Sequence, residues 1–162
     1  MKTIIAALCV TLLAGCGFHL RQSIDLPASV QPLALEMDEQ HSALAEALRH
    51  RLSINGVALA KIDIANYLLK LTNEEASDRT RSLDAFARVA EREFFHRADL
   101  SLTAKDGTRL FGPVTLQTSQ IVVNDPSDPV SEQSEADLVR NELAQDLARE
   151  IIWQLQRWAE QL

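Results

Sequence analysis

The chain has 162 residues, of which 46% are hydrophobic, 24% charged and 5% aromatic, and its formal net charge is −7. This balance is typical of one globular domain and excludes disordered and low-complexity proteins. An acidic chain lacks the basic surface of nucleic-acid-binding proteins, so we expect no nucleic-acid partner. The longest apolar run, Ile4–Leu13, has about half the length of a membrane-spanning helix.

The first residues have the pattern of a secretory signal. Lys2 precedes the apolar run, and small residues lead up to Cys16. The alternative interpretation is a buried N-terminal strand or helix that carries a cysteine. Leu13–Cys16 also resembles the bacterial lipobox, which implies cleavage before Cys16 and its conversion to an N-acyl, S-diacylglyceryl cysteine. Because stable anchoring takes about two acyl chains, a triacylated Cys16 would hold a membrane firmly.

The residues around this cysteine carry a family resemblance. Gly15–Arg21, which reads Gly-Cys-Gly-Phe-His-Leu-Arg, resembles the start of the mature chain in the LptE family of lipopolysaccharide-assembly lipoproteins. The resemblance implies two helices packed against a four-stranded sheet. It also implies an outer-membrane lipoprotein that plugs an LptD-type β-barrel, helps it assemble and assists lipopolysaccharide delivery. Gly17 fits this destination, because an Asp there is typical of inner-membrane retention.

These features divide the chain into three parts. We expect a signal peptide at 1–15, a lipidated anchor and tether at 16–32, and a single LptE-like domain at 33–162. Cleavage would remove Cys9, and lipidation would occupy the sulfur of Cys16, which leaves no free thiol. A thiol-free chain suits the oxidising bacterial envelope.

The first predicted elements of the domain are a strand and a helix. Leu33–Met37 alternates apolar and polar residues, which predicts a short, half-buried strand. Leucines then recur every four residues at Leu44, Leu48 and Leu52, which indicates one face of an amphipathic helix. Asn55-Gly56 is a typical end for this helix.

Further strands follow. A short strand is predicted at 67–71, and a clean alternation from Phe94 to Ala104 predicts a longer one. Asp106-Gly107 is a strong hairpin signal, leading into a strand at 110–116. Upstream of residue 91, Ala85, Ala87 and Val89 alternate in the opposite phase, so a bulge or strand break is expected near Arg92.

The last predicted element is a long helix. Ser134–Asp137 resembles a helix-starting capping pattern. An apolar stripe continues to the end of the chain, which predicts a helix of about 28 residues. Its members are Val139, Leu143, Leu147, Ile151, Leu155, Trp158 and Leu162. Trp153 lies off this stripe and is the aromatic side chain that we expect to be exposed; the alternative is a broader core-facing stripe that also buries it.

The order of elements favours an α+β fold. We predict a two-layer sandwich in which two helices pack on one face of a mostly antiparallel sheet of about four strands. The search for catalytic motifs finds no nucleophile elbow, phosphate-binding glycine loop or zinc-protease motif, so we expect no enzyme, cofactor or metal. His96 is interpreted as a core histidine, and Glu74-Glu75 as solvated residues of a polar loop.

The charge distribution points to a candidate binding region. Residues 79–109 hold seven basic and five acidic side chains, so this part is basic within an acidic protein. The guanidinium group of arginine can donate two parallel hydrogen bonds, which suits the phosphates and carboxylates of lipopolysaccharide. By resemblance to a family stretch, Arg88 and Arg92 are the candidate lipopolysaccharide-binding residues. The alternative interpretation of these arginines is ordinary cross-strand ion pairing.

The sequence therefore favours an LptE-like role, with an LptD-type barrel, lipopolysaccharide and the outer membrane as partners. The alternative is an auxiliary lipoprotein of another envelope lipid transporter, such as an ABC-type phospholipid system. A third class is a purely structural envelope lipoprotein.

Overall fold

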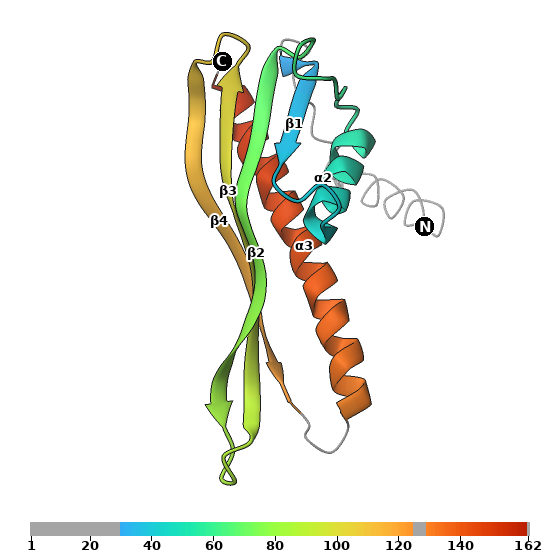
Figure 1. The fold of residues 1–162 in the computed structure, drawn as a ribbon, viewed down its shortest axis with the longest axis vertical. Coiled ribbons are helices and arrows are strands. Elements are labelled where there is room, and N and C mark those ends of the chain that lie inside the picture. The colour runs from blue at the N-terminus through green and yellow to red at the C-terminus, as the bar shows by residue number, and fades with distance from the viewer. Residues whose placement is uncertain (1–29, 125–128, 162) are drawn as a thin grey trace, which may run out of the picture.

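The structure, a computed structural model, describes residues 30–124 and 129–161. Its elements are β1 (Leu33–Met37), α2 (Ala43–Ile54), β2 (Tyr67–Leu83), β3 (Val89–Ala104), β4 (Arg109–Val123) and α3 (Pro129–Ala159) (Figure 1). The predicted signal peptide, Cys16 and most of the predicted tether lie outside the described residues. None of the helices in the described part has the length and apolarity needed to span a bilayer.

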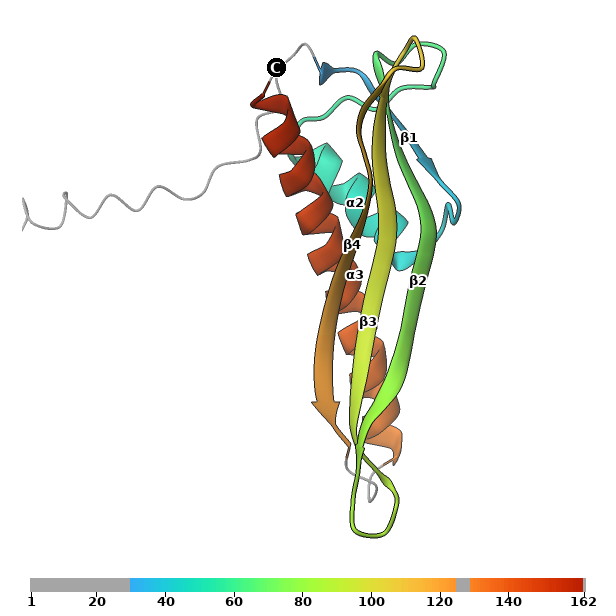
Figure 2. The same cartoon turned by 90° about the vertical axis from the view of Figure 1, so that its left-hand side faces the viewer.

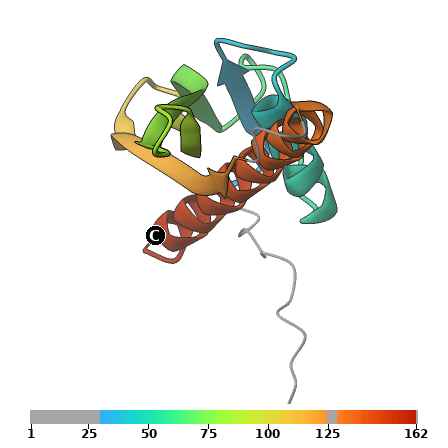
Figure 3. The ribbon, with the colours of Figure 1, turned by 90° about the horizontal axis from the view of Figure 1, so that it is seen from below.

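The four strands form one mixed sheet in the order β1-β2-β3-β4. Leu33 to Met37 pair in parallel with Tyr67 to Leu71, whereas the other two strand pairs are antiparallel. Both helices lie against the same face of the sheet, and the other face is uncovered (Figure 2). The view along the sheet shows α3 crossing beneath the strands with α2 beside it (Figure 3). The predicted fold class is confirmed.

Local sequence explains the ends of α2. The Ser42 side chain accepts a hydrogen bond from the backbone N–H of Ala45 at 3.1 Å and so caps the first turn. Asn55 ends the helix, and its amide donates to the Arg51 carbonyl. Leu44, Leu48 and Leu52 are fully buried, as their spacing predicts.

The core extends along α3. Its larger part joins α2, α3 and the sheet around buried residues such as Leu48, Leu100 and Ile151. A smaller cluster, with Phe94 and Leu143, seals the first turns of α3 against the sheet. The long helix therefore follows the strands instead of projecting away from them.

The second strand is much longer than the sequence predicts. β2 has 17 residues and continues to Leu83, because its polar half pairs with β3 at positions such as Glu75 opposite Arg97. The placement of Glu74-Glu75 in a solvated loop is therefore wrong. Polar residues on both faces hide the alternation from which a strand is predicted.

The start of β3 confirms one prediction and corrects another. The β2–β3 register shifts between Thr80 and Ser82, directly beside the pair Thr80–Arg92, so the predicted irregularity near Arg92 is present. Ala85 and Ala87 belong to no strand, since they lie in the turn that ends at Arg88.

The start of α3 also differs from the prediction. The helix begins at Pro129, so Ser134 lies inside it and does not cap it. Proline is favoured in the first helical turn, where its missing N–H is not needed. The prediction that Ser134–Asp137 starts the helix is therefore wrong.

Two opposite ends of the domain matter below. We call the end that holds the turn Asp84–Arg88 and the start of α3 the distal end. The end that holds residues 30–33, the connection 55–66, the turn 105–108 and the last turn of α3 is the proximal end (Figure 1).

Candidate functional site

The turn at the distal end presents a cation and an aromatic ring. The Asp84 carboxylate accepts hydrogen bonds from the backbone N–H groups of Phe86 (2.8 Å) and Arg88 (2.9 Å), and it pairs with the Arg88 guanidinium. These bonds, mainly those from Arg88, hold the pKa of Asp84 below its ordinary value. The guanidinium lies 5.3 Å from the centre of the Phe86 ring. The turn is therefore a fixed structure with Arg88 at its surface.

Phe86 is the feature of this turn that the sequence did not reveal. Phe86 is 79% exposed; Trp153 is exposed too, at 38%, so the prediction of an exposed Trp153 is confirmed, but it missed the more exposed ring. Trp153 is partly covered by the Arg157 guanidinium, 4.7 Å from its ring centre. Phe86 lies in the turn Asp84–Arg88 between Ala85 and Ala87, whose alternation with Val89 suggests a strand.

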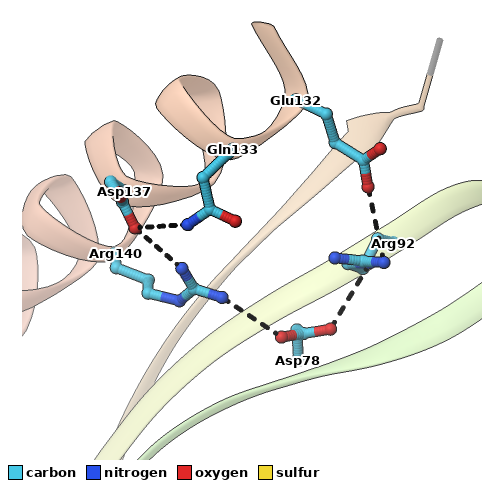
Figure 4. A network of polar contacts seen from close by, with 6 residues as sticks. All are labelled: Asp78, Arg92, Glu132, Gln133, Asp137 and Arg140. Carbon is cyan, nitrogen blue, oxygen red and sulfur yellow. Dashed lines mark hydrogen bonds and ion pairs between the residues drawn. The ribbon is translucent and has the colours of Figure 1, made fainter. Parts of the chain in front are cut away.

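Arg92 lies in a network that joins three elements (Figure 4). Its guanidinium is 3.4 Å from Asp78 of β2 and 3.4 Å from Glu132 of α3. Asp78 also contacts Arg140, which in turn pairs with Asp137 at 3.0 Å. Arg92 therefore ties the hairpin to the start of α3, and its side chain is only 30% exposed.

Two further arginines share one carboxylate on the uncovered face of the sheet. Arg79 lies 2.9 Å and Arg81 3.4 Å from the same oxygen of Glu93. The Arg79 hydrogen bond holds the pKa of Glu93 below its ordinary value of 4.5, and Arg81 acts in the same direction. A single carboxylate between two guanidinium groups leaves one positive charge in excess.

The Glu93 carboxylate gives a testable pH dependence. Because its pKa is lower in the folded protein than in the unfolded chain, it contributes stability above about pH 4.5, which is lost as the pH falls through the folded-state pKa. We expect Glu93→Gln to lower the free energy of unfolding at pH 7 and to flatten its decline in acid. Urea unfolding between pH 7 and pH 3 measures both quantities.

Glu91→Gln is the matched control for this variant. Glu91 lies on the same face, but it accepts a hydrogen bond from Ser82 and pairs with no arginine among the described residues. The assigned role of Glu93 would be contradicted if the free energy of unfolding declined in acid as steeply in Glu93→Gln as in the wild type. It would also be contradicted if the decline were flattened equally in both variants.

The distal end as a whole is not strongly basic. Residues 78–93 hold four arginines and four carboxylates, and α3 adds further acids at Glu132 and Asp137. Each of the four arginines forms an ion pair. The cross-strand pairing considered for the basic stretch is therefore present for Arg79, Arg81 and Arg92, whereas Arg88 pairs within its own turn. An anionic ligand would have to replace a carboxylate partner.

A cluster of a Ser, a His and a carboxylate in the described part of the chain is structural. The buried Glu74 side chain lies 3.0 Å from His96 Nε2 and accepts a hydrogen bond from Ser42 Oγ at 2.9 Å. In a hydrolytic triad the histidine contacts the hydroxyl, whereas here the carboxylate stands between them. His96 is 3% exposed, so its interpretation as a core histidine is confirmed. No group of side chains suited to a metal ion occurs among the described residues.

The uncovered face of the sheet is polar along its middle. Glu75 pairs with Arg97, and the next layer holds Asp99, which accepts hydrogen bonds from Thr115 (2.6 Å) and Asn73 (2.8 Å). These two bonds hold the pKa of Asp99 below its ordinary value. This face has charged and hydrogen-bonding groups that are already satisfied within the domain, with no helix or loop over them.

Comparison with known proteins gives a consistent answer. The family model described as "LptE: Lipopolysaccharide-assembly" matches residues 28–155. The LPS-assembly lipoprotein LptE of Photorhabdus laumondii is 25% identical over 154 residues, which cover 94% of this chain and 84% of that protein. The protein of the same name from Pectobacterium atrosepticum is 28% identical over 160 residues, with 94% and 83% covered.

Solved structures share the fold. The rare lipoprotein B from Shewanella oneidensis superposes with a TM-score of 0.66 at 22% identity and covers 75% of this chain and 91% of its own. The solution structure of a lipoprotein B from Nitrosomonas europaea gives a TM-score of 0.76 at 17% identity, with 89% and 93% covered. These two matches show a common α+β architecture.

Proposed function

Because the chain belongs to the LptE family of lipopolysaccharide-assembly proteins, we propose that it is an outer-membrane lipoprotein that occupies and helps assemble an LptD-type β-barrel. The family match favours this role over that of an auxiliary lipoprotein in phospholipid transport. Anchoring at Cys16 is part of the proposal. It rests on the lipobox at Leu13–Cys16 and on relatives that are named lipoproteins.

The observation that carries the plug role is the uncovered, polar face of the sheet. A domain inside a barrel meets a wall of polar side chains and ordered water, because the interior of such barrels is polar. Charged and hydrogen-bonding groups on this face can meet such a wall: they are the Glu75–Arg97 ion pair and the Asp99 carboxylate with its hydrogen-bond donors. Both helices lie on the other face, so the sheet can approach the wall without obstruction.

The length of the sheet fits the same role. The 17 residues of β2 span about 56 Å at about 3.3 Å per residue. A bilayer is about 40–45 Å thick with its headgroups. A domain anchored at its proximal end to the inner leaflet, and standing upright in a barrel, would carry its distal turn to the outer leaflet.

Lipopolysaccharide occupies that leaflet, and the distal turn has chemistry that suits it. We assign the contact to Arg88, whose guanidinium lies beside the exposed Phe86 ring and can exchange Asp84 for a phosphate. Arg92 has a supporting role in this proposal, because it holds the hairpin against α3 between two carboxylates.

Depletion of the protein tests this role. Cells without it should lose surface lipopolysaccharide and accumulate misassembled barrel, and the wild-type chain should restore both. In depleted cells, the Arg88→Glu variant should restore assembly of the barrel. The purified variant should bind lipopolysaccharide about tenfold more weakly, since one charge-assisted hydrogen bond contributes about 1.5 kcal/mol. Binding is measured with purified protein and immobilised lipopolysaccharide, and surface lipopolysaccharide by antibody labelling.

Arg97→Glu is the matched control, because Arg97 is also half exposed and paired with a carboxylate but lies in the middle of the sheet. It should bind as the wild type does. Equal binding by the Arg88 and Arg97 variants would remove Arg88 from the site. Normal surface lipopolysaccharide after depletion would contradict the proposed function itself.

A further inference from the structure

The last strand leaves one edge of the sheet open. β4 stands at the end of the strand order, so about half of its backbone N–H and C=O groups point away from β3 (Figure 1). Residues 114–123 pair with β3 without a register shift, so their outward groups form one unbroken row. Within the described part of the chain, the backbone of this stretch is bonded to no element other than β3. The edge can therefore accept another strand.

The side chains of this edge lack the charges that usually protect an open edge. Residues 110–124 are fifteen consecutive residues without a charged side chain, although 24% of the whole chain is charged. Natural proteins keep open edges from pairing with other chains by means of charged side chains, prolines or bulges. Residues 114–123 have none of these three. They are also rich in the β-branched residues that favour strands, which are Val114, Thr115, Thr118, Ile121, Val122 and Val123.

The other side of the sheet shows the usual protection. β1 pairs with β2 only as far as Leu71, so residues 72–83 of β2 have no neighbouring strand on that side among the described residues. This stretch holds five charged side chains in twelve residues, at Glu74, Glu75, Asp78, Arg79 and Arg81. β1 itself is short, and its Leu33 exchanges backbone hydrogen bonds with Ala58 and Ala60 at 2.9 Å. The edge at β4 is thus long, uncharged and uncovered in the described sheet.

A groove gives access to this edge. Residues Thr115 to Thr118 line it together with Trp153 of α3 and Ile54 of α2, and its volume is about 1120 Å³. Ile54 is 60% exposed. On the uncovered face of the sheet, the same strand carries Ile121 and Val123, which are 51% and 74% exposed. The side chains of an added strand alternate between the two faces, so they would meet apolar groups on both.

The chemistry of the edge indicates what kind of segment covers it. A charged side chain beside an uncharged strand would lose its water without gaining a partner, which is unfavourable. The segment is therefore uncharged and free of proline, like the strand that it joins. A barrel that encloses the domain surrounds it with one polypeptide, whereas a second copy would need room in the same lumen. The chain before Val30 enters the fold beside β1, at the opposite edge of the sheet.

We propose that an extended segment of the barrel protein adds to the edge of β4 as a fifth strand of the sheet. Its backbone pairs with residues 114–123, and its side chains alternate between the groove and the uncovered face. These hydrogen bonds fix the height and the rotation of the domain within the lumen. The inference rests on the proposed function, because the partner barrel supplies the added strand.

Hydrogen–deuterium exchange measures the proposed pairing. The full lipidated chain is purified in detergent, alone and in complex with the barrel, and deuterium uptake is followed by mass spectrometry of peptides. About five of the ten amides at 114–123 point away from β3 and are open to exchange in the free chain. We expect the complex to retain about five more hydrogens in this peptide than the free chain does. No added protection in the complex would overturn the inference.

Residues 72–83 are the matched control, because they form an open edge of the same sheet that is protected by charge. We expect little added protection there. Equal protection of the two edges would mean that the lumen only shields the domain from solvent, which overturns the inference. Protection of 114–123 already in the free chain would mean that a second copy or the chain's own N-terminal segment covers the edge, which overturns it as well.

Photo-crosslinking identifies the added strand. Gln117, Ser119 and Ile121, which share the uncovered face of β4, are replaced one at a time by p-benzoylphenylalanine. Contacts along paired strands advance by two residues for every two residues of β4, so the three products should map to one barrel segment in steps of two. Ser77 is the control, because it lies in the same row as Ser119 but on β2, across Phe95. Its probe should not react with that segment. Products scattered over several segments would overturn the inference.

The outcomes separate this inference from the proposed function. If the complex forms but the edge fails either test, the inference is overturned and the barrel partnership stands. If no barrel is recovered with the chain, the proposed function fails, and the inference fails with it because no barrel segment is present.

Discussion

Cys16→Ala is expected to accumulate as an uncleaved, unlipidated precursor that still carries residues 1–15. Signal cleavage at a lipobox requires the lipid-modified cysteine, so removing the sulfur blocks both steps. Each acyl CH₂ contributes about 0.8 kcal/mol to membrane binding, and the loss of all three chains removes the anchor. Intact mass and incorporation of labelled palmitate measure the result.

Cys9→Ala is the control, because Cys9 lies within the segment that cleavage removes. It should be processed and labelled like the wild-type chain. If Cys16→Ala is also processed normally and labelled with lipid, the assignment of Cys16 as the anchor is wrong. That outcome would leave the fold and the family membership unaffected.

Gly112→Ala is expected to destabilise the domain by about 2–5 kcal/mol. Gly112 lies in a β4 bulge opposite Ser101, with φ +79, a conformation that is unfavourable for residues with a side chain. A Cβ atom there would collide with the Leu100 carbonyl oxygen and come within 2.9 Å of the Ser101 Cα. Strain and collision add, since neither backbone can move without breaking the ladder. The midpoint of urea unfolding measures the loss.

Gly107→Ala separates the two causes. Gly107 also has a positive φ, +85, but a Cβ there meets nothing within 4 Å. It should therefore show the conformational cost alone, about 1 kcal/mol. Equal losses at the two glycines would mean that the close approach of β4 to β3 at Leu100 is not a constraint.

Periodicity predicted the elements that have one buried face. The leucine spacing of α2, the alternation from Phe94 to Ala104 and the stripe of α3 all correspond to buried faces in the structure. The polar half of β2 could not be predicted in this way, because Asp78 and Arg79 on its two faces are both engaged in ion pairs. That strand is stabilised by its neighbour, which is not visible in local sequence.

The candidate site was predicted in part, for a similar reason. Arg88 could be singled out by its resemblance to a family stretch, and Asp84, which holds it, is only four residues away. The partners of Arg92 lie at positions 78 and 132, and only the fold brings these carboxylates together. Charge counted along the sequence therefore overestimated the basic character of this region, since α3 adds acids to it.

The central claim is the partnership with a β-barrel, and purification through this chain tests it most directly. A C-terminally tagged version with its own signal is isolated from detergent-solubilised outer membranes. The account predicts a one-to-one, heat-stable complex with a large LptD-type β-barrel. Recovery of the lipoprotein alone, or with an inner-membrane transporter, would contradict it.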